Sequence, residues 1–488
     1  MNNVSKLLAA SSLLILAACD SDDNDPAPVE PPAPTTTVQV LHASPDAPAV
    51  NVLVNGEEAL GNVDYKDSSG WISLDAGTYS IEVQGILPDA TETVIGPADL
   101  AFEADTINTV VALNDVQNIE PVVLTQPDTP VSAGAARVWV LHAAANVQAL
   151  VGGPVDVYVT APGADLTAEA ALGSFNFKET LPADGPAELP AGEYQIRVGV
   201  GTPGDPDFLL AFDSGPVPLA DGADLVIAAV PSTIGSASAE FQSPVSLVLL
   251  DSNGSTDVFS DGTLAGVRVV HASNNTPAVD VFADGAPLIE GLEFADFAPT
   301  TGFAPVAAGT YSIAVAPAGD GVEAAAIGPA NFEFAAGTKT DVIAVGRLGG
   351  TEGTIEELTV TLAGDDPRQI PLFAKVRIIH ASVTAASLTP DTVDIYVTAP
   401  GTDISDESVA PILADVPYLA NTGYLAVAGG TYDITVTVSG SRTPAIGPLP
   451  NVAFADGGIY TVIARDALPG DAATDLGVIL IDDTPLTP

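Results

Sequence analysis

Val267-Arg268-Val269-Val270-His271-Ala272-Ser273 is the stretch of sequence that decides the fold, because near copies of it recur along the chain. The other copies are residues 38–44, 138–144 and 376–382. The four copies together contain every histidine of the protein, namely His42, His142, His271 and His380. Four copies predict four homologous domains.

The copy at residues 267–273 alternates along a strand. Residues two apart point to the same side of a sheet, so Val267, Val269 and His271 share one face, whereas Arg268 and Val270 share the other. The histidine thus lies at the end of the face that carries the paired valines. This alternation predicts that the repeats form strands.

Each copy is followed by further short strands with turn signals between them. In the third repeat the next strand is residues 279–283, and Asp284-Gly285 then gives the residue types that tolerate a tight hairpin turn. Six to eight such strands a repeat are typical of a small antiparallel sandwich. The sequence therefore predicts an all-β chain of four tandem antiparallel β-sandwich domains, either immunoglobulin-like or transthyretin-like. We expect these domains at residues 38–125, 136–252, 266–364 and 374–484.

A tyrosine begins a later strand in every repeat. These residues are Tyr79, Tyr194, Tyr311 and Tyr432, and each is followed by an inward-facing isoleucine. We expect the rings to pack in the core with the hydroxyl bonded near the surface, because buried tyrosines find a polar partner. Stacking on a sugar is the functional alternative.

Odd and even repeats differ in the loop after the histidine. Asp280 lies nine positions after His271 in the third repeat, whereas Asp156 and Asp394 lie fourteen positions after His142 and His380. The first repeat therefore resembles the third, and the second repeat resembles the fourth. The pattern indicates that a two-domain unit was duplicated.

The first 37 residues predict export and anchoring. Lys6 precedes an apolar run at residues 7–16, and the cleavage motif Leu16-Ala17-Ala18-Cys19 follows, which predicts a signal peptide at residues 1–18. The motif resembles the bacterial lipobox, which implies a lipid on Cys19, the one cysteine of the chain. Residues 19–37 are acidic and rich in proline, so we expect a disordered linker.

Charge excludes one class of partner. The chain of 488 residues has 13 Lys and Arg against 63 Asp and Glu, a formal net charge of −50. Such a surface repels phosphate backbones, so we expect no nucleic-acid binding. The acidic surface is interpreted as a solvated one that resists aggregation.

Residues 38–482 resemble a family of bacterial lipoproteins and surface proteins built from a domain of unknown function, DUF4397. The hallmark of that family is close to V-R-V-[VI]-H-A-S-P-D-A-P-x-V-D-[VI]-Y. It is well matched by residues 42–48 and by His271 with Asp280, whereas the second repeat departs from it, with Ala144 in place of serine. The resemblance implies the sandwich fold and export, and it implies no activity.

The histidines are the first candidate for chemistry. A metal site needs three or four converging ligands, but each repeat offers one histidine, no cysteine and one recurrent carboxylate. We therefore expect no metal, no cofactor and no catalytic residues. Each histidine is interpreted as a structural residue whose ring nitrogens bond loop backbone or the neighbouring Asp.

Two other motifs are weak. Residues 251–257, Asp-Ser-Asn-Gly-Ser-Thr-Asp, faintly resemble a calcium loop, and the sequence leaves weak Ca²⁺ binding open beside a solvated interdomain turn. Residues 199–204 match G-x-G-x-x-G, but Pro203 and the prolines after it prevent the helix that a dinucleotide needs.

The sequence thus favours a non-enzymatic lipoprotein of a bacterial cell envelope that presents repeated domains for adhesion, scaffolding or ligand binding. A carbohydrate- or polymer-binding lipoprotein is the alternative, and a hydrolase is the third. We expect attachment to a membrane through the lipid on Cys19, the outer membrane being favoured over the inner one, with the domains facing the periplasm or the cell surface. The partner is an unidentified envelope protein or polysaccharide.

Overall fold

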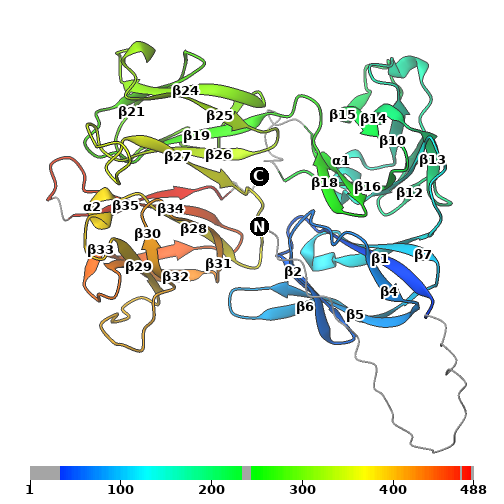
Figure 1. Cartoon of the computed structure of the whole chain (residues 1–488), viewed down its shortest axis with the longest axis horizontal. Helices are drawn as coiled ribbons and strands as arrows, with labels where there is room; N and C mark the ends of the chain where they lie inside the picture. The colour runs from blue at the N-terminus through cyan, green and yellow to red at the C-terminus, as the bar shows by residue number, and fades with distance from the viewer. Residues whose placement is uncertain (1–32, 234–242, 473–474, 485–488) are drawn as a thin grey trace, which may run out of the picture.

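The structure is a computed structural model that describes residues 33–233, 243–472 and 475–484. Strands dominate each of the four repeats, and each repeat builds two sheets (Figure 1). The prediction of an all-β chain of sandwich domains is confirmed. Among the described residues, no helix is long and apolar enough to cross a membrane.

The first domain packs sheet β4-β1-β7-β8 against sheet β3-β2-β5-β6. Its elements are β1 (Thr35–Ala43), β2 (Val50–Val54), β3 (Glu57–Val63), β4 (Ile72–Asp75), β5 (Gly77–Ile86), β6 (Thr91–Phe102), β7 (Thr106–Leu113), the 3-10 helix η1 (Val116–Asn118) and β8 (Glu120–Pro127).

The second domain packs a sheet built on β9, β16, β17 and β18 against sheet β11-β10-β14-β15. Its elements are β9 (Ala135–His142), α1 (Ala145–Val151), β10 (Val155–Thr160), η2 (Leu166–Ala168), β11 (Gly173–Phe175), β12 (Thr180–Leu181), β13 (Ala187–Pro190), β14 (Gly192–Val200), β15 (Leu209–Leu219), β16 (Asp224–Pro231), β17 (Val245–Asp251) and β18 (Gly254–Val258).

The third domain packs a sheet built on β19, β26 and β27 against sheet β21-β20-β24-β25. Its elements are β19 (Ala265–His271), β20 (Val279–Ala283), β21 (Ala286–Leu292), β22 (Phe297–Ala298), β23 (Ala304–Val306), β24 (Gly309–Pro317), η3 (Val322–Ala324), β25 (Ile327–Phe334), β26 (Lys339–Val345) and β27 (Thr359–Asp365).

The fourth domain packs sheet β31-β28-β34-β35 against sheet β30-β29-β32-β33. Its elements are β28 (Ala374–His380), α2 (Val383–Ala386), β29 (Thr392–Thr398), β30 (Leu413–Pro417), β31 (Asn421–Val427), β32 (Gly430–Val438), β33 (Pro444–Phe454), β34 (Ile459–Arg465) and β35 (Gly477–Asp482).

One strand pair in each domain departs from the antiparallel order. The histidine strand runs parallel to a later strand, as β1 does to β7 and β19 does to β26, where Val267 lies opposite Thr340 and His271 opposite Ala344. The same holds for β9 with β16 and for β28 with β34. A parallel pair needs a long crossover, and here the chain supplies it by running through the second sheet first.

Each sandwich has its own apolar core between its two sheets. In the third domain Val267 and Val269 of β19 pack with Val281 of β20 and with Ile313 and Val315 of β24. The valines that share a face with His271 therefore point inward, as the alternation predicts.

The opposite face of each histidine sheet is buried as well, against the neighbouring domain. Leu41 of β1 and Leu141 of β9 belong to one core that joins the first and second domains, which we call pair 1–2. Val270 of β19 and Ile379 of β28 belong to a core that joins the third and fourth domains, pair 3–4. Figure 1 shows pair 1–2 on the right and pair 3–4 on the left.

The sequence predicts four sandwiches, and the structure adds that they are joined in two pairs through these faces. Leu41, Leu141, Val270 and Ile379 are each no more than 1% exposed, and each lies on the face of its strand opposite the histidine. The physical reason is that histidine strands are apolar on both faces, which is typical of strands covered on both sides.

Candidate functional site

The four histidines lie at the ends of their strands and are all buried. Each of these four residues is no more than 2% exposed. In the first domain Nε2–H of His42 donates to the carbonyl oxygen of Pro48 at 3.0 Å, and Nδ1 accepts from the backbone N–H of Ser44 at 3.2 Å. One nitrogen donates while the other accepts, so the ring is held as a neutral imidazole.

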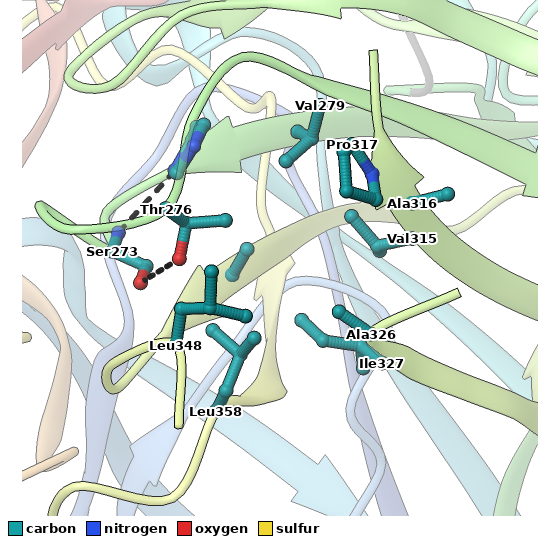
Figure 2. Close-up of a pocket in the computed structure, with 12 residues that line it drawn as sticks. Ser273, Thr276, Val279, Val315, Ala316, Pro317, Ala326, Ile327, Leu348 and Leu358 are labelled. Carbon is teal, nitrogen blue, oxygen red and sulfur yellow. Dashed lines mark hydrogen bonds between the residues drawn. The ribbon is translucent and has the colours of Figure 1, made fainter. Parts of the chain in front are cut away.

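The third domain repeats this arrangement. Nε2–H of His271 donates to the carbonyl oxygen of Pro277 at 3.2 Å. Nδ1 accepts from the N–H of Ser273 at 3.3 Å, a bond that Figure 2 marks with a dashed line. The partners are loop backbone groups, one of the two kinds of partner expected for a structural histidine. The cavity beside His271 has a mostly apolar lining. It measures about 10 Å³, which is too small for a ligand.

In the even domains a short helix takes the place of the proline-containing loop. Helix α1 follows His142, whose Nδ1 accepts from the N–H of Ala144 at 3.3 Å, and helix α2 follows His380. The longer spacing between histidine and Asp in these repeats therefore accommodates a helical turn.

Burial makes the histidines poor bases. It lowers the pKa of His42, His142 and His380 from 6.5 to about 4, and it lowers the pKa of His271 as well. Burial disfavours the charged form of an imidazole, so these rings stay neutral at physiological pH. A general base has to reach a substrate, and a ring enclosed in this way does not.

In the first, third and fourth domains the recurrent Asp or Asn on the next strand accepts hydrogen bonds from loop backbone. In the third domain Asp280 Oδ1 accepts from the N–H of Gly291 at 2.7 Å, and Oδ2 accepts from the N–H of Gly319 at 2.8 Å. Gly291 has a φ of 65°, in the left-handed region, where the strand after β20 bulges. Asn51 and Asp394 receive the equivalent bonds from Asn62 and Asp415.

The capping also fixes the charge of the fourth-domain carboxylate. Burial would raise the pKa of Asp394, but the N–H groups of Asp415 and Gly440 donate to it and hold its pKa below the usual value. Hydrogen bonds to the charged form favour that form. This carboxylate therefore stays ionised and organises the loops at the end of its domain.

Each recurrent tyrosine bonds through its hydroxyl to the backbone four residues upstream. The hydroxyl of Tyr311 donates to the carbonyl oxygen of Ala307 at 2.9 Å, four residues upstream, and the ring centre lies 6.0 Å from that of Phe334. The hydroxyls of Tyr79, Tyr194 and Tyr432 make the same bond to the residue four positions before them. The ring packs inward and the hydroxyl is bonded at the surface, which is the predicted arrangement.

The weak calcium motif forms the β17–β18 hairpin. Asp251 Oδ1 accepts from the N–H of Asn253 at 2.7 Å and of Gly254 at 3.2 Å, while Asp257 pairs with Lys66 of the first domain at 3.0 Å. β18 extends the sheet of the second domain, and the turn before it is exposed at residues 252–253 and contacts the first domain, where the N–H of Trp71 donates to the carbonyl oxygen of Ser252. In the part of the chain that the structure describes, no group of three His, Cys, Asp or Glu is placed to hold a metal ion.

Charged side chains meet in the core of pair 3–4. Asp341 of β26 accepts from Nε of Arg268 at 2.6 Å and from Nη2 of Arg377, on β28 of the fourth domain, also at 2.6 Å. All three residues are no more than 1% exposed. Asp483 completes the network by accepting from both terminal nitrogens of Arg268. The cluster therefore ties the third domain to the fourth.

Pair 1–2 has a smaller polar counterpart. Arg137 Nε donates to Asp224 at 2.9 Å within the second domain, and Gln126 of the first domain donates to the same carboxylate at 3.2 Å. The hydroxyl of Tyr65 donates to the carbonyl oxygen of Pro231 at 2.5 Å across the same junction. Sequence reasoning missed the junctions of both pairs. The feature that could have revealed them is an arginine on the face of an apolar strand that points away from the core of its own domain.

A cleft of about 710 Å³ lies between the two pairs. Its lining includes Tyr65 and Lys66 of the first domain, Phe259 after β18, Lys339 of the third domain and Arg368 before β28. The predicted site residue Cys19 lies outside the described residues.

Comparison with protein families identifies the chain. The model for the domain of unknown function DUF4397 matches residues 36–152, 265–389 and 374–488, well over half of the sequence. The chain belongs to the DUF4397 family. Most of the second domain lies outside the matched residues, consistent with the departure of that repeat from the hallmark.

Other comparisons add little to the DUF4397 assignment. No curated protein matches the chain. A solved structure of two B repeat units of the collagen binding protein of Staphylococcus aureus matches at 9% identity, over 91% of this chain and 98% of that one, with a TM-score of 0.14.

The DUF4397 hallmark now has a physical explanation in this chain. Its histidine ties the end of the first strand to the following loop, and its Asp holds the left-handed residue of a bulge. Its arginine lies on the opposite face and joins one domain to the next. These three hallmark residues organise the fold and the domain junctions.

Proposed function

We propose that this protein is a non-enzymatic, lipid-anchored scaffold of the bacterial cell envelope, which presents the end loops of its sandwiches for adhesion or ligand binding. The lipobox-like sequence ending at Cys19 supports the anchor. Acyl chains on one residue, held at the start of an acidic and proline-rich leash, give stable attachment while the domains stand away from the lipid.

The observation that carries the proposal is the burial of the histidine sheets on both faces. Leu141 and Val270 are 0% exposed between neighbouring domains, so the recurrent strands of this chain serve as structural cores. What the domains offer to a partner is then the loops at their ends and the outer faces of their second sheets. Rigid sheets with exposed loops suit binding, because the scaffold holds the loops in place.

The carbohydrate alternative requires an aromatic platform that recurs in several domains. Trp139 instead lies in the core of pair 1–2, where its indole N–H donates to the carbonyl oxygen of Pro182 at 2.9 Å. The recurrent Tyr311 ring packs on Phe334. These placements support the scaffold over a repeated sugar platform.

The anchor is tested by expressing the wild-type chain and the Cys19→Ser variant in a bacterium supplied with an alkyne-bearing fatty acid. We expect the wild type to take up the label and to sediment with membranes, and the variant to lose both properties. Protease added to intact and to permeabilised cells then reports which side the domains face. A variant that remains labelled and membrane-bound would contradict the lipid anchor.

The scaffold itself is tested with the purified chain on arrays of envelope polysaccharides and proteins, alongside a panel of ester, glycoside and peptide substrates. We expect binding to a polymer or protein and no turnover. Turnover that disappears in a His271→Ala variant that still folds would overturn the non-enzymatic assignment.

A further inference from the structure

The last strand of the histidine sheet is open at its outer edge in three domains and covered in one. Among the described residues, β8, β27 and β35 each end their sheet in the first, third and fourth domains, whereas the equivalent strand of the second domain, β17, pairs with a further strand, β18. Followed across each sheet from the residue two before the histidine, the registers lead to Val123, Leu249, Leu362 and Leu480. These four residues are therefore equivalent.

The second domain shows what fits such an edge. Leu249 lies opposite Thr256 of β18 in an antiparallel pair, and it is only partly exposed, packed against the core of its domain. The equivalent residues without a covering strand are exposed, at 38% for Val123, 39% for Leu362 and 47% for Leu480. An edge strand presents unpaired backbone N–H and C=O groups, which template the addition of another strand. The chain thus covers one of these four edges with an extended antiparallel segment.

β35 is the least protected of the three open edges. β8 contains Pro121 and Pro127, and the carbonyl oxygen of Gly364 in β27 accepts from Nη1 of Arg377. β35 has the sequence Gly-Val-Ile-Leu-Ile-Asp at residues 477–482 and lies beside β34 at the end of its sheet (Figure 1). It has no proline, lysine or bulge, which are features that natural edge strands use against pairing.

The path of the chain explains why β35 stays open. In the second domain the chain turns at residues 252–253, directly after Asp251, and returns as β18. Asp482 is the residue equivalent to Asp251. The next residue, Asp483, accepts from both terminal nitrogens of Arg268 in the third domain. The segment after β35 is thereby held against the neighbouring domain and does not turn back along the edge.

The charge around β35 favours one kind of strand. Asp475 and Asp482 are exposed before and at the end of β35, and the whole chain has a formal net charge of −50. Arg465, which lies opposite Gly477 at the start of β35, is turned toward the third domain, where its guanidinium carbon lies 5.9 Å from the centre of the Phe294 ring. The free edge therefore attracts a basic segment and repels a second copy of this acidic chain.

We infer that the open edge of β35 binds an extended, lysine-bearing segment of a partner protein, which adds to the sheet as an antiparallel strand in the way that β18 adds to β17. Backbone hydrogen bonds supply the affinity in this mode of recognition, and alternate side chains supply the specificity. One such side chain covers Leu480, and flanking lysines lie near Asp475 and Asp482. This surface is separate from the end loops and from the lipid on Cys19, so its failure leaves the proposed function standing.

The probe is a fluorescent peptide with the sequence of residues 254–259, which contain β18, placed between two lysines at each end. Titrated into the purified full chain, it should bind saturably, as measured by anisotropy, and slow backbone hydrogen exchange at residues 477–482. The same peptide with glutamates in place of the lysines should bind at least about tenfold more weakly, because its charge is repelled. A lysine peptide methylated on alternate backbone nitrogens keeps its side chains but loses the donors, and it should not bind.

A substitution on the edge itself tests the contact. Leu480→Thr keeps the charge and suits a strand but removes the apolar contact, so the affinity of the lysine peptide should fall about tenfold. Ile412→Thr is the matched control, because Ile412 is an apolar residue of the same domain with a similar exposure, 48%, immediately before β30. It should leave the affinity unchanged.

The inference is overturned if the lysine peptide does not bind, if it protects another segment instead of residues 477–482, if the methylated peptide binds equally well, or if Leu480→Thr leaves the affinity unchanged. A dimer of the wild type, detected by sedimentation and lost in Leu480→Thr, would place a second copy on this edge and equally overturn it. Hydrogen exchange at residues 477–482 is measured on the wild type, so the test stands even if a variant fails to fold.

Discussion

Asp341→Asn is the sharpest test of the junction within pair 3–4. The substitution keeps the size of the side chain and removes the carboxylate that accepts hydrogen bonds from both Arg268 and Arg377, each no more than 1% exposed. Removing one partner of a buried ion pair costs about 3–5 kcal/mol, because the remaining charge is left buried without compensation. Arg268 keeps its ion pairs with Asp483 and with Asp365, whereas Arg377 keeps hydrogen bonds to the neutral acceptors Thr461 and Gly364.

The assay is thermal and urea unfolding of the full chain, followed by circular dichroism. A loss of about 3–5 kcal/mol corresponds to about 6–20 °C in Tm for a unit of roughly 200 residues. The transition of pair 3–4 should move as a whole, since the carboxylate touches both of its domains. The transition of pair 1–2 should stay in place.

Asp224→Asn is the control in pair 1–2, where the carboxylate faces one arginine, Arg137, nearer to the surface. It should cost less, about 1–3 kcal/mol. Replacing the triad Arg268, Asp341 and Arg377 together by Met, Leu and Met should recover much of the loss, because apolar side chains need no charge compensation. The reasoning fails if Asp341→Asn costs no more than Asp224→Asn.

Three other substitutions probe the cores and the recurrent side chains. Ile343→Ala, in the core shared by the third and fourth domains, should cost about 2–5 kcal/mol and lower a transition common to both domains; separate transitions would contradict the shared core. The pKa of His42 is about 4 in the folded chain, against the ordinary value of 6.5 that we take for the unfolded chain. Between pH 6.5 and pH 4 the unfolded chain therefore binds more protons than the folded one. The free energy of unfolding should fall as the pH drops through this range. His42→Gln should flatten that slope by up to about 1.4 kcal/mol per pH unit, measured by urea unfolding at several pH values. Tyr311→Phe keeps the ring but loses the hydroxyl bond to Ala307, and it should cost about 0.5–1.5 kcal/mol in the same assay; a neutral result would show that this hydrogen bond does not stabilise the domain.

Much of the fold could be predicted from the sequence because the repeats carry the information four times. The alternation of Val267, Val269 and His271 places the core face, and Asp284-Gly285 marks a real hairpin between β20 and β21. The parallel pairing of β19 with β26 could not be predicted, since periodicity reports which face is buried and not which strand lies beside it.

The candidate site was predictable only in its residue types. The histidines and Asp280 were identified as structural, but the sequence could not place Gly291 and Gly319 around that carboxylate, because these partners come from separate loops. The burial of Arg268 was missed because an arginine in an alternating strand usually marks the solvent face. Its partner Arg377 lies in another domain, and contacts between domains leave no period in the sequence.

The double coverage of the histidine sheets has a consequence for how such chains can grow or be cut. A chain that ends after an odd number of repeats would leave one histidine sheet with its apolar face exposed to solvent. Such a chain would dimerise through that face or precipitate. Gene duplications that add repeats two at a time avoid this hazard. Relatives of this architecture should therefore favour even repeat numbers.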